Sequence, residues 1–181
     1  NFLINTILIS SAFYLFFITL RDFFIKGFKN LAQNIAHFGF SLLILSILFN
    51  SLFSSEIITN LKVGQTFENT KAKIVFESIS QKEAKNYRSI IGNFTVQDSK
   101  GKIENLSPEL RIYNQPNITT SEADIKTTLL SDKFIVINIV QNQEFFNVRY
   151  QVKPFMLWIW ISVILISFGG LISFLKKGYE K

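Results

Sequence analysis

FNVRYQVKPFMLWIWISVILISFGGLISFL, residues 146–175, contains two different periodicities on either side of a single proline. Apolar and polar residues alternate from Phe146 to Val152, which is typical of a β-strand with one face in a core and the other in water. Residues 155–175 then carry no charge for about 20 positions, enough for an α-helix to cross the hydrocarbon of a bilayer. The stretch therefore predicts a β-domain whose last strand leads into a membrane-spanning helix.

Two more segments of the 181-residue chain have the length and composition of membrane spans, at residues 2–20 and 31–53. We therefore expect two transmembrane helices and a short loop in residues 1–53, a β-domain in residues 54–153, and a third transmembrane helix with a basic tail in residues 154–181. The first span lacks the charged start and small-residue cleavage site of a signal peptide, so it is expected to be an ordinary helix of a longer polytopic protein.

The segment between the second and third spans has the polarity of a globular domain. KFIVINIV from Lys133 is apolar on both faces and rich in β-branched residues, which predicts a central strand. Shorter strands are predicted at residues 73–79, 90–96 and 109–114, separated by turn signals such as DSKG at 98–101 and NQPN at 114–117. One short helix is expected at SEADIKTTLL, starting at Ser121. The predicted fold is an α+β membrane protein, with a small antiparallel sandwich or barrel of six to eight strands inserted between helices 2 and 3.

The distribution of charge predicts which side of the membrane each part occupies. Cations concentrate in the loop after the first span and in the tail, as Arg21, Lys26, Lys29, Lys176, Lys177 and Lys181, with Glu180 as an acidic neighbour in the tail. Lys and Arg in short loops resist translocation, so both segments are expected on the cytoplasmic side and the β-domain outside. We therefore predict a multi-pass protein of the bacterial inner membrane with a periplasmic domain, or of the mitochondrial inner membrane with a domain in the intermembrane space. No basic stripe with interleaved aromatic residues is present, so nucleic acid is not an expected partner.

Residue types also exclude several kinds of chemistry. The chain has no cysteine and a single histidine. Thiolate metal sites, iron–sulfur clusters and cysteine nucleophiles are therefore excluded, and triads built on cysteine or several histidines have no material.

The single histidine, His37, lies in the second span, about 9 Å from its inner end at the rise of an α-helix. With Asn34 and Ser41 it has the spacing i, i+3, i+7, which predicts a polar stripe. A polar side chain at that depth is costly unless it faces protein. Three interpretations remain open from these residues alone: a packing hydrogen bond, a proton relay, or ligation of a metal or heme iron by the neutral imidazole.

The start of the third span contains the residues expected to anchor it at the membrane interface. Pro154 suits the first turn of a helix because it lacks an N–H. Phe155, Trp158 and Trp160 follow with the composition of an aromatic belt. Further along the span, a face of small residues that would let another helix approach closely is made of Ser162, Gly169 and Ser173.

Several short segments, in this order, resemble the C-terminal part of the CcmF family of cytochrome c heme lyases. They are AHFG at 36–39, PELRIYNQ at 108–115, TSEADI at 120–125, VRYQVKPFMLWIW at 148–160 and the glycine pair at 169–170. The resemblance covers residues 34–175, with the first span as the preceding helix.

The resemblance implies a specific cofactor and set of partners. Members of the family accept heme from a CcmE-type chaperone and, with a CcmH-type protein, attach it covalently to apocytochrome c. They also carry a heme b in the membrane, which implies that quinol is used to keep the transferred heme reduced. It further implies that His37 is an axial ligand of the heme b iron, with Asn34 and Ser41 as polar neighbours of that ligand. Because the chain has a single histidine, the second axial ligand is expected from elsewhere.

The departures from the family limit what this chain does alone. The tryptophan-rich segment that holds the transferred heme is absent, since Trp158 and Trp160 are the only tryptophans. Two outer histidines are also missing, and Leu157 replaces a residue that is often polar. No catalytic residue is therefore expected in this chain, which is interpreted as the C-terminal part of a longer CcmF or as a separate subunit that binds the remainder. The alternative is a membrane-anchored, non-enzymatic assembly or sensory module that binds a protein partner.

Overall fold

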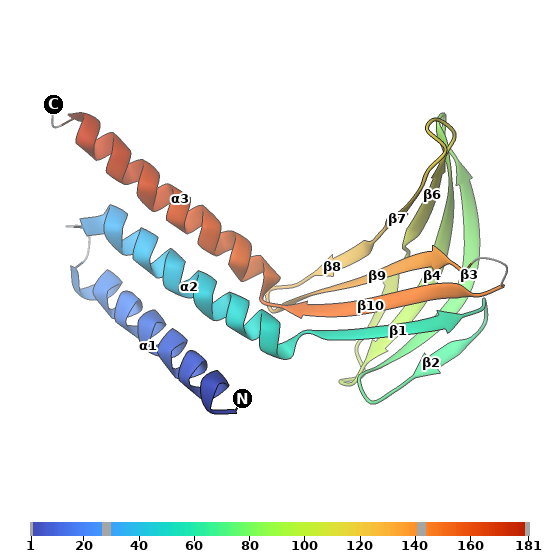
Figure 1. Ribbon diagram of the computed structural model, residues 1–181, viewed down its shortest axis with the longest axis horizontal. Helices are drawn as coiled ribbons and strands as arrows, with labels where there is room; N and C mark the ends of the chain where they lie inside the picture. The colour runs from blue at the N-terminus through green and yellow to red at the C-terminus, as the bar shows by residue number, and fades with distance from the viewer. Residues whose placement is uncertain (1, 27–29, 141–143, 180–181) are drawn as a thin grey trace. The chain divides into compact units, whose positions relative to one another are not determined.

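The computed structural model describes residues 2–26, 30–140 and 144–179 (Figure 1). Its three helices are α1 (Phe2–Lys26), α2 (Leu31–Phe53) and α3 (Met156–Tyr179). Each contains a segment long and apolar enough to cross a membrane, as the sequence predicts. The topology-bearing residues Lys29, Glu180 and Lys181 lie outside the described residues.

The helices form one compact unit in which α2 lies between α1 and α3 (Figure 1). Aromatic rings fill the contact between α1 and α2: the centroids of Phe16 and Phe38 are 5.6 Å apart, and those of Phe13 and Phe49 are 5.7 Å apart. Thr19 on α1 and Ser41 on α2 share a buried hydrogen bond of 2.6 Å. A hydrogen bond between hydroxyls satisfies both groups where water is absent, so it fixes the rotation of the two helices.

The β-domain contains ten strands among the described residues. They are β1 (Ser55–Leu61), β2 (Thr66–Glu68), β3 (Ala72–Glu83), β4 (Tyr87–Asp98), β5 (Ile103–Leu106), β6 (Glu109–Tyr113), β7 (Thr119–Glu122), β8 (Asp124–Thr127), β9 (Ser131–Ile139) and β10 (Phe146–Pro154). One sheet has the order β1-β10-β9-β8, and the other has the order β2-β3-β4-β6-β7 with β5 also paired to β4.

A single hydrophobic core lies between the two sheets, which makes the domain a sandwich. Ile135 and Val148 from the first sheet and Phe76 and Phe94 from the second are almost completely buried in it. The rings of Phe76 and Phe94 stack with centroids 4.3 Å apart. Each sheet buries alternate residues of its strands on one face, as the period-two pattern of the sequence predicts.

The long predicted strands are confirmed, and one predicted helix is wrong. The segment from Lys133 lies in β9 between β10 and β8, and the segment from Phe146 is β10, which pairs with β1. SEADIKTTLL instead contributes to β7 and β8, and Glu122 pairs with Glu109 of β6. The β-branched threonines of this segment favour strands, and the Ser121 hydroxyl donates to Asn138 instead of capping a helix. Short strands of three or four residues raise the number above the expected six to eight.

The chain divides into two compact units. One contains residues 1–54, Thr128–Asp132 and Lys153–Lys181, and the other contains Ser55–Thr127 and Lys133–Val152. The turn Thr128–Asp132 therefore belongs with the helices, although the strands on both sides of it belong to the sandwich.

Candidate functional site

His37 lies on α2, and among the described residues its side chain is exposed. The imidazole makes no hydrogen bond or ion pair within the described residues. Phe40, one turn further along the same side of α2, is 53% exposed, and Gln33, one turn back, is also exposed. The face that carries His37 is therefore covered by neither α1 nor α3.

The two polar residues predicted to flank His37 point into the helical unit instead. Asn34 and Ser41 are buried. Ser41 donates to the carbonyl of Phe38 at 2.9 Å, in addition to its hydrogen bond with Thr19. The structure thus places Asn34 and Ser41 inside the helical unit and His37 at the exposed edge of the same polar stripe, because at about 100° per residue His37 lies roughly 60° around the helix from Asn34.

Close backbone contact between α2 and α3 fixes the orientation of the His37 face. Gly169 on α3 leaves no room for a side chain: a Cβ there would lie 2.7 Å from the carbonyl oxygen of Ala32 and 2.8 Å from the nitrogen of Ala36. Gly39 on α2 is equally close to α3, with a Cβ position 2.9 Å from Cβ of Leu165. The predicted small-residue face is confirmed at Gly169, and its partner is α2.

The junction of β10 and α3 differs from the sequence prediction. Pro154 ends β10, and α3 begins at Met156. Phe155 between them has a φ of 59°, a left-handed conformation that non-glycine residues rarely adopt. The carbonyl of Pro154 accepts a hydrogen bond of 2.6 Å from the amide of Asn50, and the N–H of Phe155 donates to the carbonyl of Leu130 at 2.9 Å. Pro154 is therefore not in the first helical turn, because it is still the last residue of β10, and its carbonyl is held by α2.

The two tryptophans have different environments. The indole N–H of Trp158 donates to the main-chain carbonyl of Leu129 at 2.7 Å, so a protein group satisfies it. Trp160 is 61% exposed and has no hydrogen-bond partner within the described residues. Trp160 keeps the features of an interfacial anchor, whereas Trp158 ties the turn Thr128–Asp132 to the start of α3.

A charged cluster in the sandwich was missed by sequence reasoning. Lys133 is only 8% exposed, and its ammonium lies 3.1 Å from a carboxylate oxygen of Asp98 and 3.1 Å from one of Glu104. Lys102 also pairs with Glu104, at 2.7 Å. Only the apolar pattern around Lys133 hinted at it, since a lysine in a buried strand needs a partner.

The cluster keeps both of its carboxyl groups ionised. Burial alone raises the pKa of Asp98, but the hydrogen bonds from Lys133 and from the main-chain N–H groups of Lys102 and Lys100 outweigh it and hold that pKa below its ordinary value. Burial likewise raises the pKa of Glu104, and the hydrogen bonds from Lys102 and Lys133 hold it below its ordinary value.

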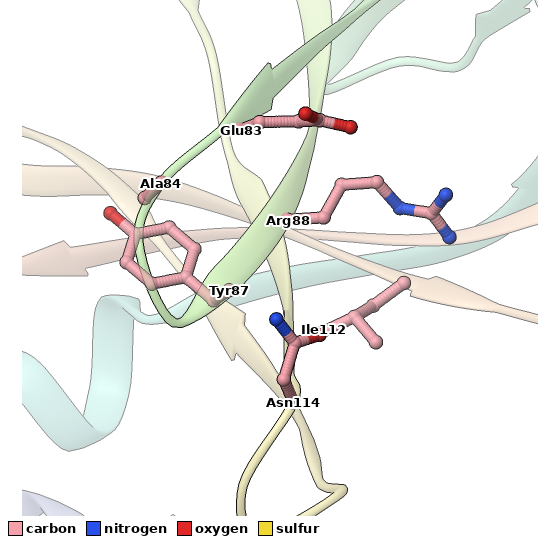
Figure 2. A pocket seen from close by; sticks show the side chains of 6 residues that line it. All are labelled: Glu83, Ala84, Tyr87, Arg88, Ile112 and Asn114. Carbon is pink, nitrogen blue, oxygen red and sulfur yellow. The ribbon is translucent and has the colours of Figure 1, made fainter.

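A polar depression of about 290 Å³ lies beside the turn between β3 and β4 (Figure 2). Figure 2 shows the side chains of Glu83 and Arg88 extending to the same side, with the ring of Tyr87 on the other. Glu83 and Arg88 are not ion-paired with each other, and both are exposed. One acid and one base in water, without a third group to orient them, do not form a catalytic site.

Residues 2–26, 30–140 and 144–179 contain no group of three or more His, Asp or Glu side chains that would hold a metal ion. The one described group suited to a metal centre is therefore the lone imidazole of His37, which coordinates iron only together with other donors.

These features define a class of protein, a helical membrane protein with an antiparallel β-sandwich inserted between α2 and α3. The chain belongs to the CcmF family, because the family model described as "CcmF C-terminal beta-sandwich" matches residues 52–154.

Named relatives agree with this assignment. The chain is 29% identical over 161 residues to "Cytochrome c-type biogenesis protein CcmF" of Pseudomonas fluorescens, which covers 86% of this chain and 24% of that protein. It is 32% identical over 119 residues to "Cytochrome c-type biogenesis protein ccl1" of Rhodobacter capsulatus, covering 66% of this chain and 18% of the relative. The chain thus spans about a quarter or less of the length of these relatives.

One solved structure has a similar fold. "Cytochrome c Heme Lyase CcmF" superimposes with a TM-score of 0.60 and 17% sequence identity, over 77% of this chain and 23% of that chain. The similarity shows that the two chains share this fold.

Proposed function

We propose that this chain is the C-terminal part or a subunit of a cytochrome c heme lyase, and that His37 is an axial ligand of a heme b held in the membrane. The observation that carries the proposal is the exposed imidazole of α2, which has no partner within the described residues and lies in a segment long and apolar enough to cross a membrane. Membership of the CcmF family and the names of the relatives support the reaction class.

The residues around His37 fit the proposed cofactor. Burial in a bilayer favours the neutral imidazole, whose nitrogen lone pair is free to bind iron. Exposed Phe40 and Ile47 on the same side of α2 supply apolar surface of the kind that a porphyrin contacts. Bound heme supplies one-electron redox chemistry. The chain supplies the donor atom, and α1 and α3 hold the helix that presents it.

The second axial ligand and the heme-attachment site belong to the remainder of the assembly in this proposal. The sequence has no second histidine, and its one methionine, Met156, is the first residue of α3, at the other end of the span from His37. The expected partners are the rest of CcmF, CcmE-type and CcmH-type maturation proteins, apocytochrome c and quinol.

The proposed location is a bacterial inner membrane with the sandwich in the periplasm, or a mitochondrial inner membrane with the sandwich in the intermembrane space. The support is the concentration of cations at the end of α1 and just after it, as Arg21, Lys26 and Lys29, and at the end of α3 and in the tail, as Lys176, Lys177 and Lys181. In either compartment the sandwich is proposed as the docking surface for maturation partners.

A reduced-minus-oxidised absorbance spectrum of the purified complex tests the proposal. We expect a b-type α-band that is lost in His37→Ala and retained in the matched control Gln33→Ala, which alters an exposed polar residue one turn away. Imidazole added to His37→Gly should restore the band if ligation is the role of the side chain. An α-band unchanged in His37→Ala would eliminate His37 as a ligand and leave the membrane-anchored, non-enzymatic module as the better description.

A further inference from the structure

The β-sandwich carries a depression of about 300 Å³ that is independent of the His37 face. Strand residues on one side and the turns before β3 and after β4 on the other form its walls. The lining residues that supply polar groups are Ser55, Thr70, Lys71, Ser99, Lys100 and Tyr150, together with Asp98 and Lys133 of the charged cluster.

The acceptors in this depression are already occupied. One carboxylate oxygen of Asp98 accepts hydrogen bonds from the main-chain N–H groups of Lys100 and Lys102, at 2.9 Å and 3.0 Å. The other oxygen accepts from the ammonium of Lys133 at 3.1 Å. Lys133 has two carboxylate partners, which leaves one of its three N–H groups free. The depression therefore offers donors, and its one carboxylate already accepts three hydrogen bonds from the protein.

Tyr150 supplies a further hydrogen-bond donor to the depression. The residue is 3% exposed, yet its phenol makes no hydrogen bond within the described residues. Because Tyr150 lines the depression and its phenol oxygen is not among the fully buried atoms without a partner, the hydroxyl can donate to an acceptor that enters the depression. Burial, followed by the nearby charges of Glu104 and Asp98, raises the pKa of Tyr150, so the phenol stays protonated and remains a donor.

Two lysines add positive charge at the rim. Lys71 and Lys100 line the depression, and neither ammonium has an ion-pair partner within the described residues. The turns that carry them are rigid, because the side chain of Asn69 accepts from the N–H groups of Lys71 and Ala72 at 2.9 Å. Ser99 N–H also donates to the carbonyl of Lys71 at 3.1 Å, which joins the two turns. The main-chain positions of Lys71 and Lys100 are thus set by the fold, while their exposed side chains are free to turn towards a ligand.

We propose that this depression binds the oxyanion of a phosphate group, with Tyr150 and Lys133 contacting it from below and Lys71 and Lys100 from the rim. A phosphate offers more acceptor oxygens and more charge than a carboxylate, which matches a site made of several donors. The phosphate comes either from a phospholipid headgroup or from free phosphate.

Binding is measured on the full chain in maltoside detergent, as a rise in melting temperature with added ligand. The probes are inorganic phosphate, dihexanoyl phosphatidylglycerol and dihexanoyl phosphatidylcholine, each compared with chloride at equal ionic strength. Tyr150→Phe removes only the unpartnered phenol oxygen and should weaken phosphate-group binding about tenfold, the effect of one hydrogen bond to a charged group. Lys71→Gln combined with Lys100→Gln should weaken it at least as much, and exposed Lys85→Gln, which lies outside the depression, should bind like the wild type.

Two results support the proposal and identify the source of the phosphate. A response to both lipids that exceeds the response to inorganic phosphate assigns the headgroup, and an equal or larger response to inorganic phosphate assigns the free ion. Equal stabilisation by chloride overturns the proposal, as does unchanged binding in Tyr150→Phe with the double lysine variant also unaffected. Melting temperatures without ligand show that each variant is folded.

Discussion

Replacing Gly169 with alanine should loosen the contact between α2 and α3. The added Cβ would lie 2.7 Å from the carbonyl oxygen of Ala32, where an ordinary carbon–oxygen contact is about 3.4 Å. The atoms it meets are mostly main chain, so the helices have to separate by roughly 0.7 Å at this point, and overpacking of this kind costs about 1–3 kcal/mol. Gly170→Ala is the matched control, because nothing lies within 4 Å of its Cβ position.

Both variants gain the same stability from replacing a glycine within a helix, about 0.5–1 kcal/mol. The difference between them therefore isolates the clash, and we expect Gly169→Ala to be less stable than Gly170→Ala by about 1–3 kcal/mol. The measurement is unfolding of the full chain by dodecyl sulfate in mixed micelles, followed by the fluorescence of the two tryptophans, both of which lie in α3. Equal free energies of unfolding for the two variants would refute the close approach of α2 and α3.

Two other predictions concern the junction and the charged cluster. Trp158→Phe removes the hydrogen bond from the indole to the turn after β8 and should lower the free energy of unfolding by about 1 kcal/mol, whereas Trp160→Phe should change it little, as measured by the same detergent titration. Asp98 and Glu104 have folded-state pKa values below their ordinary values of 3.8 and 4.5, so their contribution to stability is present at neutral pH and is lost as the pH falls below those values. Lys133→Met removes an ammonium that helps to hold both pKa values down, so the variant should be less stable than the wild type at neutral pH and should lose less stability on acidification, because protonating the two carboxyl groups then costs the folded state less. Melting curves recorded against pH measure this difference, and an equal loss of melting temperature on acidification in both proteins would contradict the role of the cluster.

The elements with strong periodicity were predictable from the chain alone. Hydropathy located all three helices, since length and absence of charge are local properties. Alternation located β10, and an apolar run located β9. The prediction of a helix from Ser121 was wrong: the capping signals favour a helix, but pairing with β6 makes the start of this segment a strand. Strand pairing involves residues distant in sequence, so a local pattern does not contain it.

The candidate site divides in the same way. From the residues alone, one imidazole could be assigned to a membrane-spanning segment, Gly169 to a close helix contact, and a β-domain to the segment before the last helix. The packing of the folded chain was needed to show that His37 faces outward while Ser41 faces Thr19, and that Lys133 meets two carboxylates from other strands. The physical reason is that hydropathy and periodicity act within a few residues of chain, whereas the partner of a buried polar group is set by how separate helices and strands pack together.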